Sequence, residues 1–408
     1  MTATPSPATP TTFNPFSFDF HADPYPTYRW LRDEHPVYRD DALDCWVLSR
    51  YADVLEAHRD WQTYSSAHGP MIEPVDPVFF EAYPMLIAMD PPRHTRMRKL
   101  VNRVFTPNRV AGLEPQVRAI ATRLLDPLAE AGGGDFVADF SALLPMEVIF
   151  ILLGVPASQR LEMRETVDTM LDRDADSPAI PARAIEASID LHRRLDAFVA
   201  ELRVDPAAHP GLIADLLEVE VETDGGGSVR LTDAEVSGFC GLLGAAGSET
   251  VARLLANAAV LFGRFDHVHR AVLADPRRIP DAVEEVLRFW PPSQIQARTT
   301  TRAVTLHGTT LPEGARVLML TGAANRDERE FDAPDELRLD RPPHVALGFG
   351  HGIHVCLGAS LARLEGRVAL EEFNARFPAY VVDESRCERV HMTNVHGFSR
   401  VPFARDGS

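Results

Sequence analysis

The stretch from Thr232 to about Phe262 is apolar on nearly all sides for about 30 residues, and it constrains the fold of this 408-residue chain more than any other feature. Glu235 follows Thr232 at the third position, a pattern typical of a capping box at a helix N-terminus. A helix that is apolar all round must be buried, and at about 1.5 Å per residue this one would cross a whole domain. We therefore expect a mainly helical protein built around one long central helix.

The same stretch contains glycines at every third position, namely Gly238, Gly241, Gly244 and Gly247. Each costs about 1 kcal/mol relative to alanine inside a helix. Either neighbouring helices pack closely against them, or a flat or bulky ligand lies on this face. The ligand also accounts for Glu249 and Thr250, because buried carboxylates and hydroxyls are costly unless they are paired or used. We therefore expect a ligand beside this helix, and a proton relay in which Thr250 bonds to a carbonyl oxygen one turn back.

Hydrophobic periodicity and turn signals divide the rest of the chain. Residues 1–18 are rich in Thr, Pro and Ala and are expected to form a flexible lead-in. No linker divides residues 19–408, so we expect a single domain, rich in helices at about 91–290 and in strands at about 36–50, 291–320 and 380–405. The stretch from Ser65 to Asp90 has no sustained period, and a loop of this length in a compact protein is usually functional. We expect it to be a lid.

Composition excludes several classes of protein. The formal net charge of −18 disfavours nucleic acid as a partner, because duplex binding depends on neutralising phosphates with Lys and Arg. No apolar segment reaches the roughly 20 residues of a membrane span. No signal segment is visible at the N-terminus, and four scattered cysteines do not suggest a disulfide framework. We expect a cytoplasmic protein.

Cys356 lies in the segment FGHGIHVCLG, residues 349–358, between glycines and histidines. A zinc site lacks a fourth ligand at the usual spacing. A nucleophilic cysteine would need a base that nothing else in the sequence indicates. A structural buried cysteine leaves the flanking glycines unexplained. A thiolate ligand to haem iron explains them, because Gly350 and Gly352 would let the backbone approach a porphyrin, and a helix beginning near Gly358 would stabilise the thiolate.

This segment is similar, position for position, to the haem-binding signature of the cytochrome P-450 family, in particular its bacterial members. Three further stretches resemble motifs of that family in the same order. "AAGSET" resembles the acid and alcohol pair of the long central helix, with Glu249 and Thr250 in those places. "EEVLR" resembles the E-x-x-R motif, with Glu285 and Arg288. "FDAPDELRLDRPPHVALGFG" resembles the segment that supplies Arg341 to that pair. The resemblance covers the chain from about Asp19 to its end.

The resemblance implies a mainly α fold with small β-sheets: a single domain shaped as a triangular prism, with a long central helix and a loop carrying the cysteine ligand. It implies haem b as cofactor and O2 as co-substrate, with Cys356 as axial ligand of the iron and Glu249 and Thr250 as catalytic groups. The structural triad would be Glu285, Arg288 and Arg341. Further residues that would contact the haem, several of them at its propionates, are His94, Arg98, Arg298, Phe349, Gly350, His354 and Gly358.

The activity implied is insertion of one oxygen atom from O2 into a hydrophobic small molecule, such as a polyketide, terpenoid, steroid or aromatic compound. Candidate pocket residues by family position are Ile87, Leu242, Ala245, Ala246, Ile295 and Val395, with polar groups from Ser293, Gln294 and Gln296. Electrons would come from a separate ferredoxin or flavodoxin with its NAD(P)H-dependent reductase, docking near the Arg-rich stretch that begins at Arg93. We expect a monomer. The alternatives are a haem-thiolate enzyme that uses peroxide directly, and a non-catalytic haem-binding or recruitment module.

Overall fold

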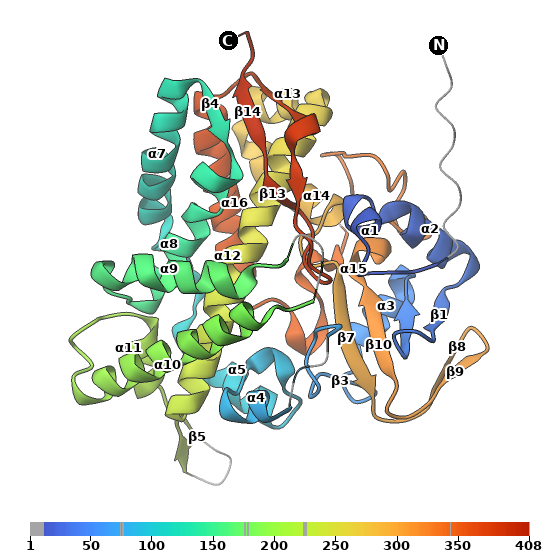
Figure 1. The fold of residues 1–408 in the computed structure, drawn as a ribbon, viewed down its shortest axis with the longest axis vertical. Helices are drawn as coiled ribbons and strands as arrows, with labels where there is room; N and C mark the ends of the chain where they lie inside the picture. The colour runs from blue at the N-terminus through green and yellow to red at the C-terminus, as the bar shows by residue number, and fades with distance from the viewer. Residues whose placement is uncertain are drawn as a thin grey trace.

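The computed structural model describes residues 12–73, 75, 77–174, 177, 179–222, 227–342 and 344–407. Most of the helices lie on one side of the molecule, and the largest sheet, covered by the N-terminal helices, lies on the other (Figure 1). The chain is mainly helical with small sheets, as the sequence predicted. No helix among the described ranges is long and apolar enough to cross a membrane.

The N-terminal third contains short helices and the first strands. Their bounds are α1 Phe18–Ala22, α2 Tyr25–Glu34, β1 Val37–Asp40, β2 Cys45–Leu48, α3 Tyr51–Arg59, β3 Tyr64–Ser65, α4 Pro77–Ala82, α5 Arg93–Val104 and α6 Pro107–Ala111. The expected lead-in of residues 1–18 is too long. Phe13 is buried because its ring packs edge-to-face on Phe20, with the ring centres 5.5 Å apart. Residues 1–11 lie outside the described ranges.

The middle of the chain is almost entirely helical. The elements are α7 Glu114–Ala131, β4 Gly133–Asp135, α8 Leu143–Leu153, α9 Ala157–Leu171, α10 Ala182–Val204, α11 Leu212–Glu218, β5 Val221–Glu222, β6 Ser228–Val229, α12 Asp233–Arg264, α13 Asp266–Ala274 and α14 Ile279–Phe289. The predicted central helix is α12. Its capping box is formed as expected, with the Thr232 hydroxyl accepting from the Glu235 N–H and the Glu235 carboxylate accepting from the Thr232 N–H.

The last part of the chain alternates strands and helices. It contains β7 Ile295–Thr300, β8 Val304–Leu306, β9 Thr309–Leu311, β10 Arg316–Leu320, α15 Thr321–Ala324, α16 Ala359–Arg376, β11 Tyr380–Val382, β12 Glu388–Arg389, β13 Phe398–Arg400 and β14 Pro402–Arg405. The predicted strand-rich regions 36–50 and 291–320 join into one mixed sheet with the order β1-β2-β10-β7-β3, in which β2 and β10 run parallel.

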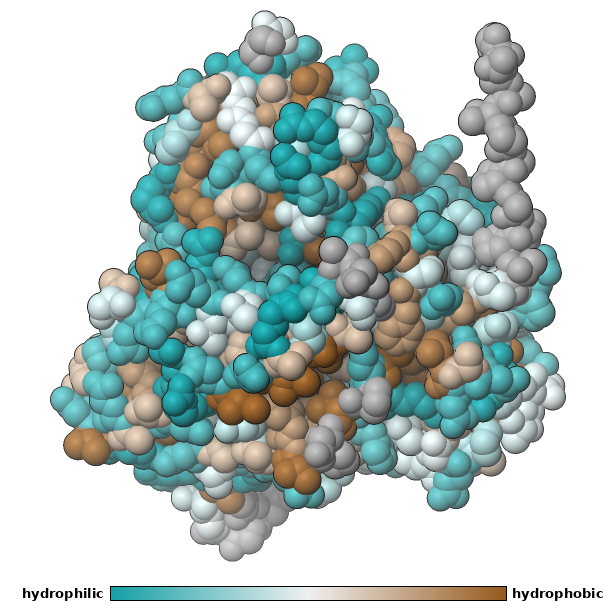
Figure 2. Space-filling model, in the orientation of Figure 1, coloured by the Kyte–Doolittle hydropathy of each residue, from teal (hydrophilic) through white to brown (hydrophobic). Residues whose placement is uncertain are grey.

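The core has one large part and two smaller ones. The large part surrounds α12, which packs against α8, α10, α14 and α16, while α16 also packs against α7. The smaller clusters lie on the two faces of the five-stranded sheet. On the face shown in Figure 2 hydrophilic residues predominate, and apolar residues gather near the middle. The arrangement leaves an internal cavity between α12, the end of β7 and the loop that precedes α16.

Candidate active site

One cavity collects most of the residues singled out in the sequence. Its apolar wall comes from the 65–90 segment and α12, including Leu86, Ile87, Leu242 and Ala246. The opposite end is formed by the loop from Gly348 to Gly358 and the start of α16. Sequence-distant motifs therefore face one space. The segment predicted to be a lid carries the short helix α4 and a 3-10 turn at Leu86–Ala88, and that turn contacts the cavity.

The loop before α16 presents the sulfur of Cys356 to this cavity, where the side chain is exposed. The backbone N–H of Cys356 donates to the Phe349 carbonyl oxygen over 2.9 Å and closes the loop. Gly352 has a φ of 68°, and a Cβ there would lie 2.2 Å from the carbonyl oxygen of His58. Gly352 is therefore needed for contact with α3, rather than for a porphyrin as the sequence suggested.

The surroundings of Cys356 act on its pKa in opposite directions. Enclosure by protein raises the pKa of the thiol, and this effect outweighs the rest. The N–H of Gly358 and the positive charges of Arg98 and Arg363 lower it, because each favours the thiolate. The nearby cations and the N-terminus of α16 favour the thiolate, and the sulfur is accessible from the cavity; both properties suit an anionic metal ligand. Among the described residues no cluster of three or more His, Cys, Asp or Glu could hold a metal ion, so a zinc site has no support.

Arginine and histidine side chains line the same cavity, and neither arginine forms an ion pair with a carboxylate among the described residues. Arg298 is 4% exposed, the only hydrogen bond of its guanidinium within the described protein goes to the Ala297 carbonyl oxygen, and burial lowers its pKa to about 10. Burial, reinforced by Arg298, lowers the pKa of His354 to about 3, and the Nε2 atom of His354 has no hydrogen-bond partner. Arg98 also lines the cavity and donates to the Val355 carbonyl oxygen over 2.9 Å. Buried donors in this number fit a group with two carboxylates, as the propionates of haem are.

Other predicted haem contacts divide into two groups. Phe349, Gly350 and Gly358 line the cavity. His94 does not: it lies behind the wall, 3% exposed, with its ring centre 4.5 Å from that of His354. Its Nε2 atom also lacks a hydrogen-bond partner, and its place behind His354 lets it pack against that ring from the side away from the cavity.

Glu249 and Thr250 point to different sides of α12. Thr250 lines the cavity, and its hydroxyl donates to the Ala246 carbonyl oxygen over 2.7 Å, which is the bond that the sequence predicted. Glu249 lies outside the cavity wall and forms an ion pair of 2.8 Å with Arg253. Arg253 in turn donates to the Phe398 carbonyl oxygen in β13. The acid and the alcohol are therefore adjacent in sequence but do not share the same surroundings.

The glycines of α12 are explained mainly by packing, contrary to the prediction. A Cβ at Gly238 would lie 2.7 Å from the Pro84 carbonyl oxygen, and one at Gly241 would lie 2.7 Å from the Nε2 atom of His192. Gly247 borders the cavity, but its Cβ direction meets Ile149 at 2.8 Å. Only Gly244 has no neighbour within 4 Å of an added Cβ. The lid segment, α10 and α8 therefore approach the helix where side chains are missing.

Three of the six pocket candidates line the cavity, namely Ile87, Leu242 and Ala246, and Ala245 does not. The choice of Ile295 is wrong by one residue. Alternate residues of a strand face opposite sides, so Gln296 and Arg298 face the cavity while Ile295 packs with Leu318 and Leu320 on the other face of the sheet.

Two other candidates fail for related reasons. Val395 is buried and forms a bridge with Ser293, behind the wall instead of on it. Gln294 is also buried on the far side, where its amide bonds to Tyr25 and Tyr28.

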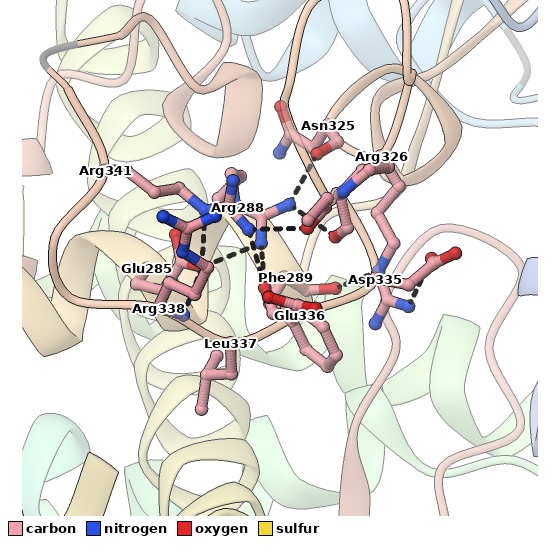
Figure 3. A network of polar contacts seen from close by, with 12 residues as sticks. Glu285, Arg288, Phe289, Asn325, Arg326, Asp335, Glu336, Leu337, Arg338 and Arg341 are labelled. Carbon is pink, nitrogen blue, oxygen red and sulfur yellow. Dashed lines mark hydrogen bonds and ion pairs between the residues drawn. The ribbon is translucent and has the colours of Figure 1, made fainter. Parts of the chain in front are cut away.

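The structural triad forms as the motifs suggested (Figure 3). Arg288 is fully buried and donates to Glu285 through Nε and Nη2, each over 2.8 Å. Arg341 donates to the same carboxylate over 2.9 Å, and the N–H of Arg338 does so as well. Arg288 also donates to the carbonyl oxygens of Asn325, Pro334 and Glu336. Burial raises the pKa of Glu285, but the bonds and charge of Arg288 outweigh this and leave it lowered. The triad anchors the segment that leads into the Cys356 loop.

Among the cavity residues that sequence reasoning missed, two are ionisable, His58 and Glu365. His58 in α3 is 6% exposed and neither ring nitrogen has a hydrogen-bond partner. Burial, with Arg298 nearby, lowers its pKa to about 3. A histidine on the buried face of an amphipathic helix was the available signal. Glu365 in α16 is 1% exposed, and both of its carboxyl oxygens lack partners. Burial raises its pKa well above the ordinary value, which favours the neutral form.

Comparisons with known proteins agree with this geometry. Residues 278–401 match the family model described as cytochrome P450, written P-450 below. The chain is 44% identical over 394 residues to cytochrome P-450 123 of Mycobacterium tuberculosis, covering 96% of each protein. It is 38% identical over 398 residues to a vitamin D(3) 25-hydroxylase of Pseudonocardia autotrophica, covering 95% of each. The crystal structure of CYP109E1 from Bacillus megaterium in complex with corticosterone superimposes with a TM-score of 0.84 and 29% identity, over 95% of this chain and 100% of that one.

Proposed function

The chain belongs to the cytochrome P-450 family, and we propose that it is a monooxygenase acting on a bulky apolar molecule of the steroid, terpenoid or polyketide kind. The family resemblance and the mainly α fold predicted from the motifs are confirmed by these similarities. Haem b and O2 belong to this activity. The observation that supports the proposal best is that Cys356 and Thr250, from motifs about a hundred residues apart, face the same apolar cavity.

In this proposal Cys356 would bind the haem iron, and four side chains that line the same cavity would hold the propionates: His58, Arg98, Arg298 and His354. The bound haem supplies the activation of O2 and the insertion of one oxygen atom into the substrate. The protein excludes water from the apolar half of the cavity and places the substrate against α12. The reduced carbon monoxide difference spectrum tests this proposal, since the absence of the Soret band typical of a haem-thiolate would overturn it.

Thr250 and Glu249 are proposed to deliver protons from different sides of α12. The Thr250 hydroxyl donates to the Ala246 carbonyl oxygen, so its lone pairs remain free to accept a hydrogen bond from water in the cavity. Glu249 would take up protons on the outer side, once its ion pair with Arg253 opens. We expect Thr250→Ala to release more hydrogen peroxide per reductant consumed, while Thr250→Ser retains most of the coupling. Unchanged coupling in Thr250→Ala would remove this role.

The substrate class is proposed from the cavity and from relatives. The wall above Thr250 is apolar, with Leu242, Ala246 and Ile87. One relative is named for vitamin D(3), and the structure of another contains corticosterone, both rigid apolar molecules. Exposed apolar side chains stand on α4, within the lid segment, and on α10, which contacts it through Phe79 and His192; Val78 and Ile189 are among them and suit the approach of such a molecule. A panel of steroids, terpenoids and macrolides titrated for the low-to-high-spin Soret shift would identify the class.

A separate electron donor is proposed because the chain has only four cysteines, too few to bind an iron–sulfur cluster in addition to the haem. Part of the Arg-rich stretch is occupied within the protein: Arg96 pairs with Glu235 and Arg109 with Asp215. Arg93 and Lys99 are exposed and have no partner within the described part of the chain. They would attract an acidic ferredoxin or flavodoxin. A peroxide-using enzyme is less well supported, because Thr250 is in place at the cavity wall.

A further inference from the structure

Two polar side chains line the cavity where β7 begins. Ser293 and Gln296 both line the cavity there. Ser293 is also fixed from behind by a backbone bridge to Val395. Its side chain therefore sits on a wall that two separate segments of the chain hold in place.

The orientation of the Gln296 amide is determined by its neighbours. Its nitrogen donates to the carbonyl oxygen of Ser293 over 3.2 Å and to the Ser293 hydroxyl over 2.8 Å. A carbonyl oxygen can only accept, so the amide nitrogen and not the oxygen must face Ser293. The Gln296 oxygen then accepts from the Thr321 hydroxyl over 2.5 Å.

This arrangement leaves the hydrogen of the Ser293 hydroxyl unused. The hydroxyl oxygen already accepts from Gln296, whose nitrogen offers no lone pair in return. No acceptor for the Ser293 hydrogen exists within the described part of the chain, and Ser293 lines the cavity. A polar group enclosed in this way is satisfied in the free enzyme by water and must find a partner when an apolar ligand displaces that water.

We propose that Ser293 is a specificity-determining donor, and that the substrate carries a neutral carbonyl or ether oxygen which accepts its hydrogen bond. This inference rests on the proposed function and names a feature of its substrate. Gln296 and Thr321 are positioning residues, because they act only by fixing the direction of the Ser293 hydroxyl. A pure hydrocarbon of the same shape would leave the hydrogen unpaired, so the pocket rejects it although most of the wall is apolar.

The test uses two matched pairs of probes, adamantanone with adamantane and androstanone with androstane, in equilibrium dialysis against the haem-loaded protein. The native protein is expected to bind the ketone of at least one pair about tenfold more tightly than the hydrocarbon, which corresponds to ~1.4 kcal/mol. Ser293→Ala should lose this preference, because the ketone loses its hydrogen bond and the hydrocarbon no longer leaves a donor unpaired, and Ser293→Thr should retain it. Ser248→Ala is the control, because that hydroxyl lies outside the cavity and already donates to the Gly244 carbonyl oxygen.

Each other outcome overturns the inference. Equal binding of ketone and hydrocarbon by the native protein would remove the donor role. An equal loss for both probes in Ser293→Ala would indicate a structural effect. Failure of both pairs to bind, with a normal haem-thiolate spectrum, would overturn the donor role and leave the monooxygenase intact. An abnormal spectrum would instead overturn the proposed function.

Discussion

The glycines of α12 provide a matched pair for testing how the central helix packs. Gly238 and Gly244 lie in the same buried helix, six residues apart. Replacing either by alanine gains about 1 kcal/mol of helix propensity. The new methyl at residue 238 would meet backbone atoms of Tyr83 and Pro84 at 2.7–2.9 Å, whereas the methyl at residue 244 would meet nothing within 4 Å.

The difference between the two variants isolates the packing term, because the propensity gain cancels. Overpacking costs about 1–3 kcal/mol, and backbone is less able to move than the end of a side chain. Gly244→Ala should therefore be more stable than the native protein by up to ~1 kcal/mol. Gly238→Ala should be less stable than Gly244→Ala by about 1–3 kcal/mol, and it should displace the lid segment.

The assay is urea unfolding of both haem-loaded variants, followed by far-UV circular dichroism, at equal haem occupancy. The Soret spectrum checks that each variant still binds haem normally. A difference below ~0.5 kcal/mol, the range of ordinary neutral substitutions, would refute the packing explanation. The reverse order of stability would favour the ligand explanation that the sequence suggested.

Further predictions concern charge and protonation. Glu285→Gln should lower the free energy of unfolding by about 3–5 kcal/mol because it removes a carboxylate from a buried ion pair. Glu365→Gln should cost far less, because that carboxyl has no partner among the described residues to lose and burial favours its neutral form; urea unfolding at neutral pH compares the two variants. Because the pKa of Glu285 is lower in the folded protein than in the unfolded chain, the stabilisation that its charge provides is fully present above the unfolded pKa and is lost as the pH falls through the folded pKa. The native protein should therefore lose more stability in acid than Glu285→Gln does. Burial, helped by neighbouring positive charges, lowers the pKa of His396 to about 3. Below about pH 6.5 only the unfolded state therefore binds a proton at this residue, and the free energy of unfolding falls by about 1.4 kcal/mol for each unit by which the pH is lowered. His396→Gln should flatten this slope between about pH 6 and 5, and an unchanged slope would contradict the assignment. Lys99→Glu should slow reduction of the haem by an acidic ferredoxin at low salt, as stopped-flow measurements would show. At high salt the variant should have little effect, because dissolved ions screen exposed charges. A loss of rate that does not depend on salt would argue against electrostatic steering.

Much of the site was predictable because its motifs are local. The capping box at Thr232, the Thr250 bond to Ala246 and the pairing of Glu285 with Arg288 depend on spacings of three or four residues within one helix. Helix geometry alone fixes such neighbours. The Cys356 segment is equally local, since a loop leading into a helix N-terminus places the sulfur.

The errors arose where the outcome depended on a neighbouring segment. The facing of β7 was taken from family position, and only the pairing of Ile295 with β10 shows that this residue belongs to the far side while Gln296 faces the cavity. Glu249 was grouped with Thr250, but successive helix residues point in directions about 100° apart, and Arg253 holds the acid away from the cavity.

The sequence by itself determined the long buried helix, the cysteine in a glycine-rich loop and the Glu285–Arg288 pair, because each is encoded within a few residues, and the resemblance of these motifs to one family implied a haem-thiolate monooxygenase. The tertiary structure decided which side chains share a space: it placed His58 of α3 beside Arg298 of β7, and it brought the lid segment against Gly238. It also left the Ser293 hydroxyl without an acceptor. Such relations depend on contacts between segments distant in the chain, which no local pattern of residues specifies.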